Sequence, residues 1–284
     1  MMNKICIIGV GLIGGSFAAG LKKSNQVETI VGFGRNESNL IKAQALNVID
    51  EYSLDIAQAL VGASLILIAT PVNSFKSVLE MIKPHVTEKM IVTDVGSTKT
   101  SVVDMARQVF ETVPENFIPA HPIAGKEQSG VEAADANLFN NKRVIITPEV
   151  NANTQSVATV SELWEAIGAK VEIMNTSKHD DLLAMTSHLP HMLAFGLMDY
   201  LISNDPDACD YAAGGFKDFS RIASSDAVMW RDICINNPEQ IVKHIEGYQK
   251  SLDNIANLIK NNQPEALEKL FSDAKSARDG WLKD

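Results

Sequence analysis

The chain has few cysteines and fewer positive than negative charges. Its 284 residues include three cysteines, 25 Lys and Arg and 35 Asp and Glu, so its formal net charge at pH 7 is -10. Cys6, Cys209 and Cys234 lie far apart in apolar or helical surroundings, which excludes a disulfide framework or a cysteine metal site and is typical of a reducing compartment. The acidic residues are spread along the chain, which argues against nucleic acid or an anionic membrane surface as a partner.

Long uninterrupted apolar runs are also missing. The run over residues 5–21 is broken by Gly9, Gly11, Gly14 and Gly15 and has no clear cleavage site, so we interpret it as a strand, a turn and a helix of a cytoplasmic protein, not as a signal peptide. The run over residues 190–202 is shorter than the roughly 20 residues that a membrane helix needs. We therefore expect no membrane segment, and we expect the 45% of hydrophobic residues to fill buried cores.

The first half of the chain alternates short apolar runs with amphipathic stretches. Five β-branched runs predict buried parallel strands, at residues 5–8, 29–33, 65–69, 90–93 and 117–120. Two more runs, at residues 144–147 and 170–174, predict further strands on either side of a helix over residues 154–167. The alternation predicts an α/β fold whose N-terminal part is a Rossmann-type doubly wound sheet with helices on both faces.

After Met174 the pattern becomes helical, because apolar residues recur with a period of about 3.6 and no convincing strand follows. A helix capped by Thr176 and Ser177 is predicted to begin near His179 and to continue toward residue 201, with Pro190 disturbing its hydrogen bonds. Further helices are predicted over residues 227–235, 239–259 and 265–282. We expect a dinucleotide-binding domain over residues 1–175 and an all-helical domain over residues 176–284, packed closely with a cleft between them.

A glycine-rich turn follows the first predicted strand and opens a helix, which is the context that makes this pattern informative. Gly9 permits the tight turn, Gly11 lets the backbone approach a pyrophosphate, and Gly14 allows close packing of strand and helix. Leu12 and Ile13 lie in the first helical turn, whose N-terminus faces the anion. The turn predicts a dinucleotide site, and the alternative is a glycine turn with a structural role alone.

The end of the second predicted strand indicates which dinucleotide binds. An NAD site usually presents an acidic side chain about 20 residues beyond the glycines, but here that position is Gly34. Arg35, Asn36 and the nearby Ser38 supply a guanidinium and small donors that suit a phosphate. We predict that NADP is the preferred cofactor and that NAD is possible, the alternative being that Arg35 is a solvated loop residue.

Polar segments follow three of the predicted strands. Because the carboxyl ends of parallel strands converge on the ligand crevice of an open α/β sheet, we expect Thr70, Ser97 and His121 to line one site. Taken by itself, His121 could equally be an ordinary loop histidine, but Pro122 and Gly125 beside it favour a shaped active-site loop.

The sequence resembles the prephenate and arogenate (cyclohexadienyl) dehydrogenases along nearly its whole length. The segments that carry the resemblance are the glycine turn, DVGSTK at residues 94–99, HPIAGKE at 121–127, SHLPH at 187–191, GGFKDFSRIA at 214–223 and MWRDI at 229–233. The resemblance implies an NAD(P)-dependent oxidative decarboxylation of prephenate to 4-hydroxyphenylpyruvate in tyrosine biosynthesis. The alternative substrate is the amino counterpart arogenate, which would give tyrosine directly.

The resemblance also implies roles for individual residues. His121 would take up the proton of the ring hydroxyl, as a neutral imidazole can, and Ser97 would hydrogen-bond the same hydroxyl or orient the imidazole. Arg221 would pair with the side-chain carboxylate of the substrate, and His188 would meet the substrate from the helical domain. Three further residues match family positions at the pocket or at the mouth of the cleft, namely Gly214, Trp230 and Glu127.

The family likeness implies a homodimer formed by the helical domain. We expect no metal, because aromatisation and loss of carbon dioxide supply the driving force. We also expect no fused mutase and no regulatory domain, because the sequence begins at the first predicted strand and ends near the last predicted helix. One alternative is a metal held by His188 and His191 together with His121, His179 or Asp181. A second alternative is a β-hydroxyacid dehydrogenase, which would be expected to carry a catalytic lysine in its second domain. The third is a noncatalytic NADP-binding sensor, which would bind NADP without reducing it.

Overall fold

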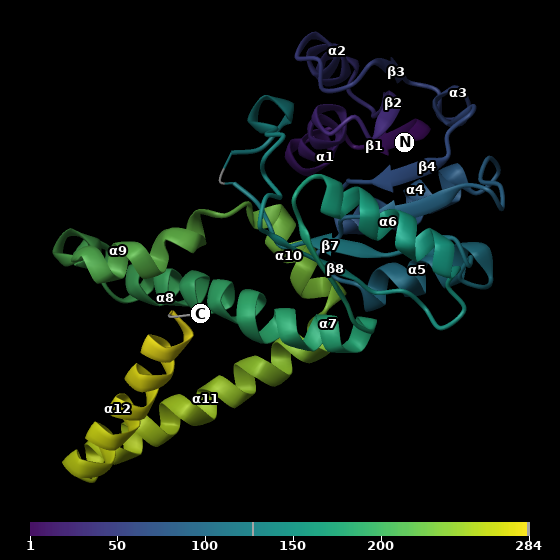
Figure 1. Cartoon of the computed structure of the whole chain (residues 1–284). Helices are drawn as coiled ribbons and strands as arrows, with labels where there is room; N and C mark the ends of the chain where they lie inside the picture. The colour runs from purple at the N-terminus through teal and green to yellow at the C-terminus, as the bar shows by residue number, and fades with distance from the viewer. Residues whose placement is uncertain (127, 283–284) are drawn as a thin grey trace. The chain divides into compact units, whose positions relative to one another are not determined.

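The N-terminal part of the chain forms a six-stranded parallel sheet with helices on both faces (Figure 1). The structure is a computed structural model that describes residues 1–126 and 128–282. The strands occur in the order β3-β2-β1-β4-β5-β6. They are β1 (Met2–Ile8), β2 (Val27–Phe33), β3 (Glu51–Ser53), β4 (Leu65–Ile68), β5 (Ile91–Asp94) and β6 (Phe117–Ile118). This arrangement confirms the predicted Rossmann-type sheet.

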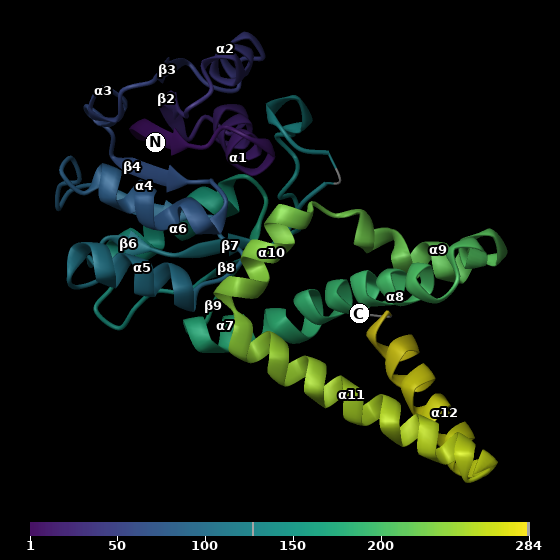
Figure 2. The same ribbon diagram turned by 180° about the vertical axis from the view of Figure 1, so that it is seen from behind.

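Two hydrophobic cores cover the two faces of this sheet. Successive side chains of a strand point to opposite faces, so Ile5 and Ile7 of β1 lie in one core and Cys6 and Ile8 in the other. The first core is covered by α1 (Leu12–Lys23), α2 (Glu37–Ala45) and α6 (Thr154–Ala166). The second is covered by α3 (Ile56–Leu60), α4 (Phe75–Ile82) and α5 (Thr100–Phe110), as the reverse view in Figure 2 shows.

A second, three-stranded sheet follows, so the expectation that the predicted strands form a parallel sheet fails for the last of them. It consists of β7 (Ala120–Pro122), β8 (Arg143–Ile146) and β9 (Lys170–Ile173), with β7 antiparallel to β8 and β8 parallel to β9. The predicted strand over residues 117–120 is divided at Pro119, which has no N–H to donate to a sheet. The chain leaves the first sheet at this proline, and His121 therefore belongs to the second sheet.

The part after β9 is helical, as predicted, but the first helix begins earlier than expected. The helix α7 (Thr176–Leu183) starts at Thr176, and the side chain of Asn175, not those of Thr176 and Ser177, caps it by accepting the N–H of Lys178 at 2.8 Å. A π-helical turn (Ala184–His188) leads into α8 (Leu189–Asn204), with Pro190 in its first turn. Proline has no N–H for the helical ladder, which agrees with the predicted disturbance at this point.

The remaining helices agree closely with the predicted ranges, apart from one that was not expected. They are α10 (Ala227–Asn236), α11 (Pro238–Lys260) and α12 (Pro264–Trp281). The unexpected helix α9 (Gly214–Ser220) is joined to α10 by a short 3-10 helix, Arg221–Ser224. None of the helices in residues 1–126 and 128–282 has the length and apolar character that crossing a bilayer requires.

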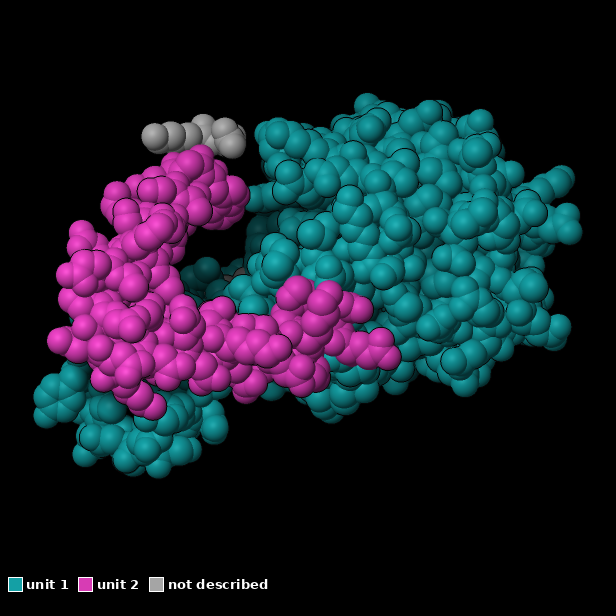
Figure 3. All heavy atoms as spheres, turned by 90° about the horizontal axis from the view of Figure 1, so that it is seen from below, with its two compact units in different colours: residues 1–238 teal, residues 239–284 magenta. Residues whose placement is uncertain are grey.

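By the contacts within the chain, residues Met1–Pro238 form one compact unit and residues Glu239–Asp284 form a second, coloured separately in Figure 3. The first unit therefore contains both sheets and the helices α1 to α10. The predicted boundary near residue 175 divides the chain by type of secondary structure, and it stays a prediction.

Candidate active site

The glycine turn between β1 and α1 is shaped by close backbone packing. Gly9 has a φ of +96°, and a Cβ there would lie 2.6 Å from the carbonyl oxygen of Ala69. A Cβ at Gly14 would lie 2.4 Å from the carbonyl oxygen of Gly9, whereas a Cβ at Gly11 would meet no atom within 4 Å. No side chain caps α1 at Gly11. The turn therefore leaves open space and helical N–H groups where a pyrophosphate would bind.

A cavity of about 420 Å³ lies between this turn and the end of β2. It is lined by Gly34, Arg35, Asn36 and Thr70, and the Thr70 hydroxyl is buried without a hydrogen-bond partner among the described residues. None of the described residues lining it is an aspartate or glutamate. The oxygen of Asn36 is occupied, because it accepts the N–H of Asn39 at 3.2 Å and the Ser38 hydroxyl at 2.7 Å. The exposed Arg35 is thus the charged group that this cavity offers to a ligand.

A larger cavity of about 880 Å³ extends from the same turn to the helical region. Gly11 and Gly130 line both cavities, which are therefore adjacent. Lys126, His191 and Arg221 supply its basic side chains, and Lys126 also forms an ion pair of 2.9 Å with Asp135. The carboxylate of Asp226 is its acidic group among the described residues, and it caps α10 by accepting the N–H of Met229 at 2.7 Å. The lining is basic in an otherwise acidic protein, which suits an anionic ligand.

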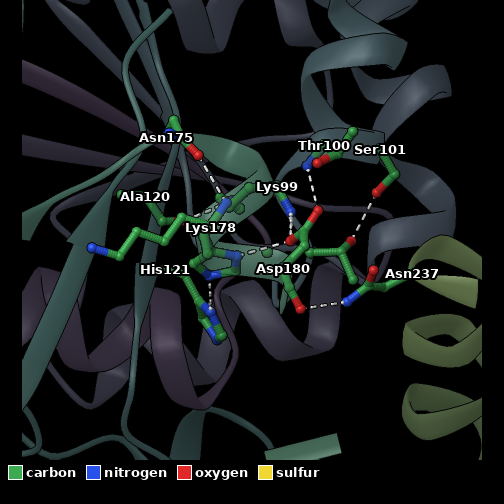
Figure 4. Close-up of polar contacts among 12 residues, drawn as sticks. Lys99, Thr100, Ser101, Ala120, His121, Asn175, Lys178, Asp180 and Asn237 are labelled. Carbon is green, nitrogen blue, oxygen red and sulfur yellow. Dashed lines mark hydrogen bonds and ion pairs between the residues drawn. The ribbon is translucent and has the colours of Figure 1, made fainter. Parts of the chain in front are cut away.

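A chain of hydrogen bonds leads from His121 into the protein (Figure 4). His121 Nδ1 lies 2.8 Å from Nε2 of His179, and His179 Nδ1 lies 2.8 Å from Oδ1 of Asp180. Both partners come from α7, whereas His121 comes from β7. The carboxylate of Asp180 also accepts the backbone N–H groups of Lys99 and Thr100, each at 2.8 Å. The start of α7 is thereby fastened to the start of α5.

These contacts define the tautomers of both imidazoles. Burial raises the pKa of Asp180, but the hydrogen bonds from His179 and from the N–H groups of Thr100 and Lys99 outweigh this effect and hold its pKa below the usual value. An ionised carboxylate only accepts hydrogen bonds, so His179 Nδ1 carries the proton and Nε2 accepts the Nδ1–H of His121. This assignment leaves the lone pair of His121 on Nε2.

The charge state of His121 agrees with a proton acceptor. Burial, followed by the nearby His179, Lys99 and His188, lowers the pKa of His121 well below its usual value. The pKa of His179 is also lowered, mainly by burial. Both rings are therefore neutral at physiological pH, as the hydrogen-bond pattern requires.

A pair of histidines and a tryptophan lie beside the larger cavity. The His191 ring stacks on Trp230 with 3.8 Å between ring centroids, and its Nδ1 donates to the carbonyl of Ser187 at 2.9 Å. His188 is buried, contacts the edge of Trp230 and has no described hydrogen-bond partner at Nδ1. Burial lowers the pKa of His188 to about 4. Of the two histidines, His191 is the one that lines the cavity.

Comparison with known proteins identifies the family. Two family models match the chain, the nucleotide-binding domain of prephenate dehydrogenase over residues 17–173 and the dimerization domain of prephenate dehydrogenase over residues 175–273. This chain belongs to the prephenate dehydrogenase family.

Relatives in the family match along nearly the whole chain. The prephenate dehydrogenase of Lactococcus lactis is 36% identical over 281 residues, which cover 98% of this chain and 77% of that protein. The crystal structure of A. aeolicus prephenate dehydrogenase with hydroxyphenyl propionate and NAD+ has a TM-score of 0.94 and 37% identity, covering 99% of this chain and 98% of that one. The structure of Synechocystis arogenate dehydrogenase has a TM-score of 0.85 and 30% identity, covering 98% and 99%.

The residues that the sequence singled out for this prephenate dehydrogenase family member fall into three groups. The cavities are lined by Gly9, Gly11, Leu12, Ile13, Gly34, Arg35, Asn36, Thr70 and Arg221, and Gly14 packs behind the turn. Ser97 and His121 are half-buried, on the loop after β5 and on β7. Of the three residues expected to line one site, Thr70 lines the smaller cavity, whereas Ser97 and His121 are not among the described residues that line either cavity. The same holds for His188, Gly214 and Trp230, and Glu127 lies outside the described residues. The functional roles of all these residues stay predictions.

Several groups at this site were not predicted from the sequence. His179 was considered only as a metal ligand, Asp180 and Lys99 were not considered for the site, and His191 was given no substrate contact. The available signal was local, since Asp180 directly follows His179 and Lys99 ends the DVGSTK segment. Within residues 1–126 and 128–282, no three His, Cys, Asp or Glu side chains are grouped to hold a metal ion.

Proposed function

We propose that this chain catalyses the oxidative decarboxylation of prephenate to 4-hydroxyphenylpyruvate, a step of tyrosine biosynthesis, with reduction of a nicotinamide dinucleotide. The observation that carries the proposal is the chain from His121 through His179 to Asp180, which leaves a lone pair on His121 Nε2 in a member of this family. The dinucleotide, when bound, supplies the acceptor for the hydride. The protein must then supply anion binding and a proton acceptor.

The residues divide this work between the two regions of the site. The basic lining around Arg221 binds the carboxylates of the substrate dianion. His121 Nε2 accepts the proton of the ring hydroxyl while hydride leaves the same carbon, and Ser97 hydrogen-bonds that hydroxyl. The resulting imidazolium is stabilised through His179 by the Asp180 carboxylate. Loss of carbon dioxide and formation of the aromatic ring supply the driving force.

Prephenate is favoured over arogenate by the charges that line the larger cavity. Arogenate carries an ammonium group where prephenate carries a keto oxygen, and an ammonium group needs a carboxylate or other acceptor as its partner. The acidic side chain among the described lining residues, Asp226, already caps α10. Parallel steady-state assays with the two substrates test this choice, and a higher kcat/KM for arogenate would reverse it.

A spectrophotometric assay of cofactor reduction with prephenate tests the reaction itself. Turnover is expected from the native chain, and cofactor binding without turnover would identify a noncatalytic sensor instead. His121→Asn is expected to lower kcat by about 10² to 10⁴ with a smaller change in KM, because it removes the proton acceptor. His85→Asn, which alters a histidine after α4, is the matched control. An unchanged kcat in His121→Asn would reject the assigned role.

We further propose that the enzyme prefers NADP to NAD. The support is local, since the cavity beside β2 offers the exposed guanidinium of Arg35 and no described carboxylate that would repel a 2'-phosphate. Arg35→Ala is expected to weaken NADP binding by about tenfold, with little effect on NAD, because it removes one charge-assisted contact at an exposed position. Titrations of both cofactors measure the two dissociation constants, and a native preference for NAD would contradict the proposal.

The helical part is proposed to form a homodimer. The match to a dimerization-domain model over residues 175–273 supports this, as do exposed apolar side chains on α11 and α12, among them Leu252, Ile259 and Phe271. Light scattering coupled to size-exclusion chromatography measures the mass in solution. A monomer at micromolar concentration would reject the dimer.

A further inference from the structure

Lys99 is the least expected charged group near the site, because its side chain is completely buried. A buried ammonium is strongly destabilising unless its neighbours compensate for the lost water. Its Nζ forms an ion pair with Oδ2 of Asp94, the last residue of β5, and also donates to the carbonyl of Ala120 at 2.8 Å. One side chain thus joins β5 to β7 at the residue that precedes His121.

The loop that carries Ser97 is held at both ends by carboxylates. Near its start, the N–H of Gly96 donates to Asp94 at 2.7 Å. Near its end, the backbone N–H of Lys99 donates to Asp180 at 2.8 Å (Figure 4). Asp94 also accepts the N–H of Ala120 at 3.2 Å. Lys99 therefore contacts β5 and β7 by its side chain and α7 by its backbone.

We propose that Lys99 is a positioning residue for the proton acceptor, which fixes the Ser97 loop against the strand of His121 and whose positive charge opposes protonation of the imidazole. The proposal rests on the proposed function in one respect, namely that His121 accepts a proton during turnover. The geometry and the charge of Lys99 can be tested without any substrate.

The electrostatic part of the proposal depends on which groups face His121. His179 faces it from α7 with Asp180 behind it, and His188 lies on the π-helical turn. Lys99 comes from the loop before α5, with Asp94 as its partner. The histidines are neutral when their pKa values are lowered, so Lys99 is the group that carries a positive charge at pH 7. The positive charge of Lys99 opposes protonation of His121, and the carboxylates of Asp180 and Asp94 favour protonation of the neighbouring His179.

Burial lowers the pKa of Lys99 and raises that of Asp94, while their mutual attraction opposes both shifts. Three N–H groups converge on the two oxygens of Asp94, from Lys99, Gly96 and Ala120. An ionised carboxylate accepts all three N–H groups, and the contact with a charged ammonium is then a charge-assisted hydrogen bond. The ionised pair fits the observed hydrogen bonds, and we treat Lys99 as charged.

The test follows the ring nitrogens of His121 by 15N NMR during a pH titration of the apo protein, with His121→Asn used to assign the signal. In the native chain, Nδ1 is expected to carry the proton at pH 7. Lys99→Met is expected to raise the pKa of His121 by about half a unit or more, because it removes a positive charge from a buried site. Lys178→Met, which removes an exposed lysine beside His179, is expected to leave the titration unchanged.

Kinetics supply the second measurement. Lys99→Met is expected to lower kcat with prephenate by about tenfold or more, with cofactor affinity unchanged within about twofold, since Lys99 is not among the described residues lining either cavity. In Lys99→Met the buried Asp94 carboxylate loses its ion-pair partner, which could prevent folding. The double variant Asp94→Asn/Lys99→Met removes that charge as well, and it replaces the single variant in both measurements if the single variant does not fold.

The outcomes separate the two proposals. A folded variant with the native His121 titration and the native kcat would overturn the role of Lys99. Failure of both variants to fold would assign Lys99 to stability alone and would overturn the role as well. Absence of turnover in the native chain would refute the proposed function instead, and the titration would still decide whether Lys99 sets the pKa of His121.

Discussion

The charged groups behind His121 are buried and hydrogen-bonded, whereas those around Arg221 face solvent. Behind His121, the side chains of Asp94, Lys99 and Asp180 are buried and linked by hydrogen bonds to named partners. Around Arg221, the basic side chains face a cavity of about 880 Å³, and Arg221 itself is exposed. Buried charges interact strongly and lose much when a partner is removed, whereas exposed charges are screened by water. Substitutions behind His121 should therefore affect catalysis more than substitutions in the cavity affect binding.

Asp180→Asn is expected to have the largest effect of the substitutions that distinguish the two regions. The amide must place an NH2 group where an oxygen now accepts, so either His179 changes its tautomer or the N–H of Thr100 loses its acceptor. In the first case His121 Nε2 carries a proton and cannot accept one. We expect kcat to fall by about 10² to 10⁴, as in other enzymes whose carboxylate orients a catalytic histidine.

Stopped-flow or steady-state kinetics measure this change, and thermal unfolding of the variant checks its fold. Asp199→Asn is the matched control, because it removes the same charge from an exposed carboxylate on α8. Equal kcat values for Asp180→Asn and the native enzyme would show that the chain of hydrogen bonds has no catalytic role.

The fold could be predicted largely from local sequence because its signals are local. The buried strand β4 is a continuous β-branched and leucine run, and the long helices show their period directly. The short strand β3 was missed because its three residues carry no apolar run. The departure of the chain at Pro119 was missed because pairing of β7 with β8 depends on residues more than 20 positions later.

In the site, too, features set by neighbouring residues could be predicted and contacts between residues far apart in the sequence could not. The glycine turn could be predicted since Gly9 and Gly14 each meet a steric demand within the turn or its neighbouring strands. The contact of His121 with His179 joins residues 58 positions apart, and the contact of Lys99 with Asp180 joins residues 81 positions apart. No periodicity or spacing reports such pairings, so the sequence predicts a role for His121 but not the groups that contact it.

His188 is another buried titratable group, with only 1% of its surface exposed, and its burial should make the stability of the fold depend on pH. Its pKa of about 4 in the folded chain lies below the usual 6.5, so the unfolded state binds a proton first as the pH falls. The free energy of unfolding should therefore decrease from about pH 6.5 down to pH 4, and His188 alone should contribute about 3 kcal/mol at roughly 1.4 kcal/mol per pKa unit.

Urea unfolding at pH 7 and at pH 4.5 measures this loss. Carboxylates also titrate in this range, so the decisive quantity is the difference between the native chain and His188→Gln, which should lose less stability on acidification. His85→Asn should lose as much as the native chain. Identical pH dependence in all three proteins would contradict a buried, neutral His188.

Arg221→Gln is expected to have the smallest effect, because it acts in the exposed region. Removal of one cation from the cavity should raise KM for prephenate by roughly 5- to 30-fold, about 1–2 kcal/mol, and should change kcat little. The increase should shrink at high salt, since an exposed charge is screened. Lys217→Gln, which removes a positive charge on α9 away from the described cavity lining, is the control. A loss in kcat as large as that of Asp180→Asn would mean that Arg221 acts in the transition state, and the contrast between the two regions would not hold.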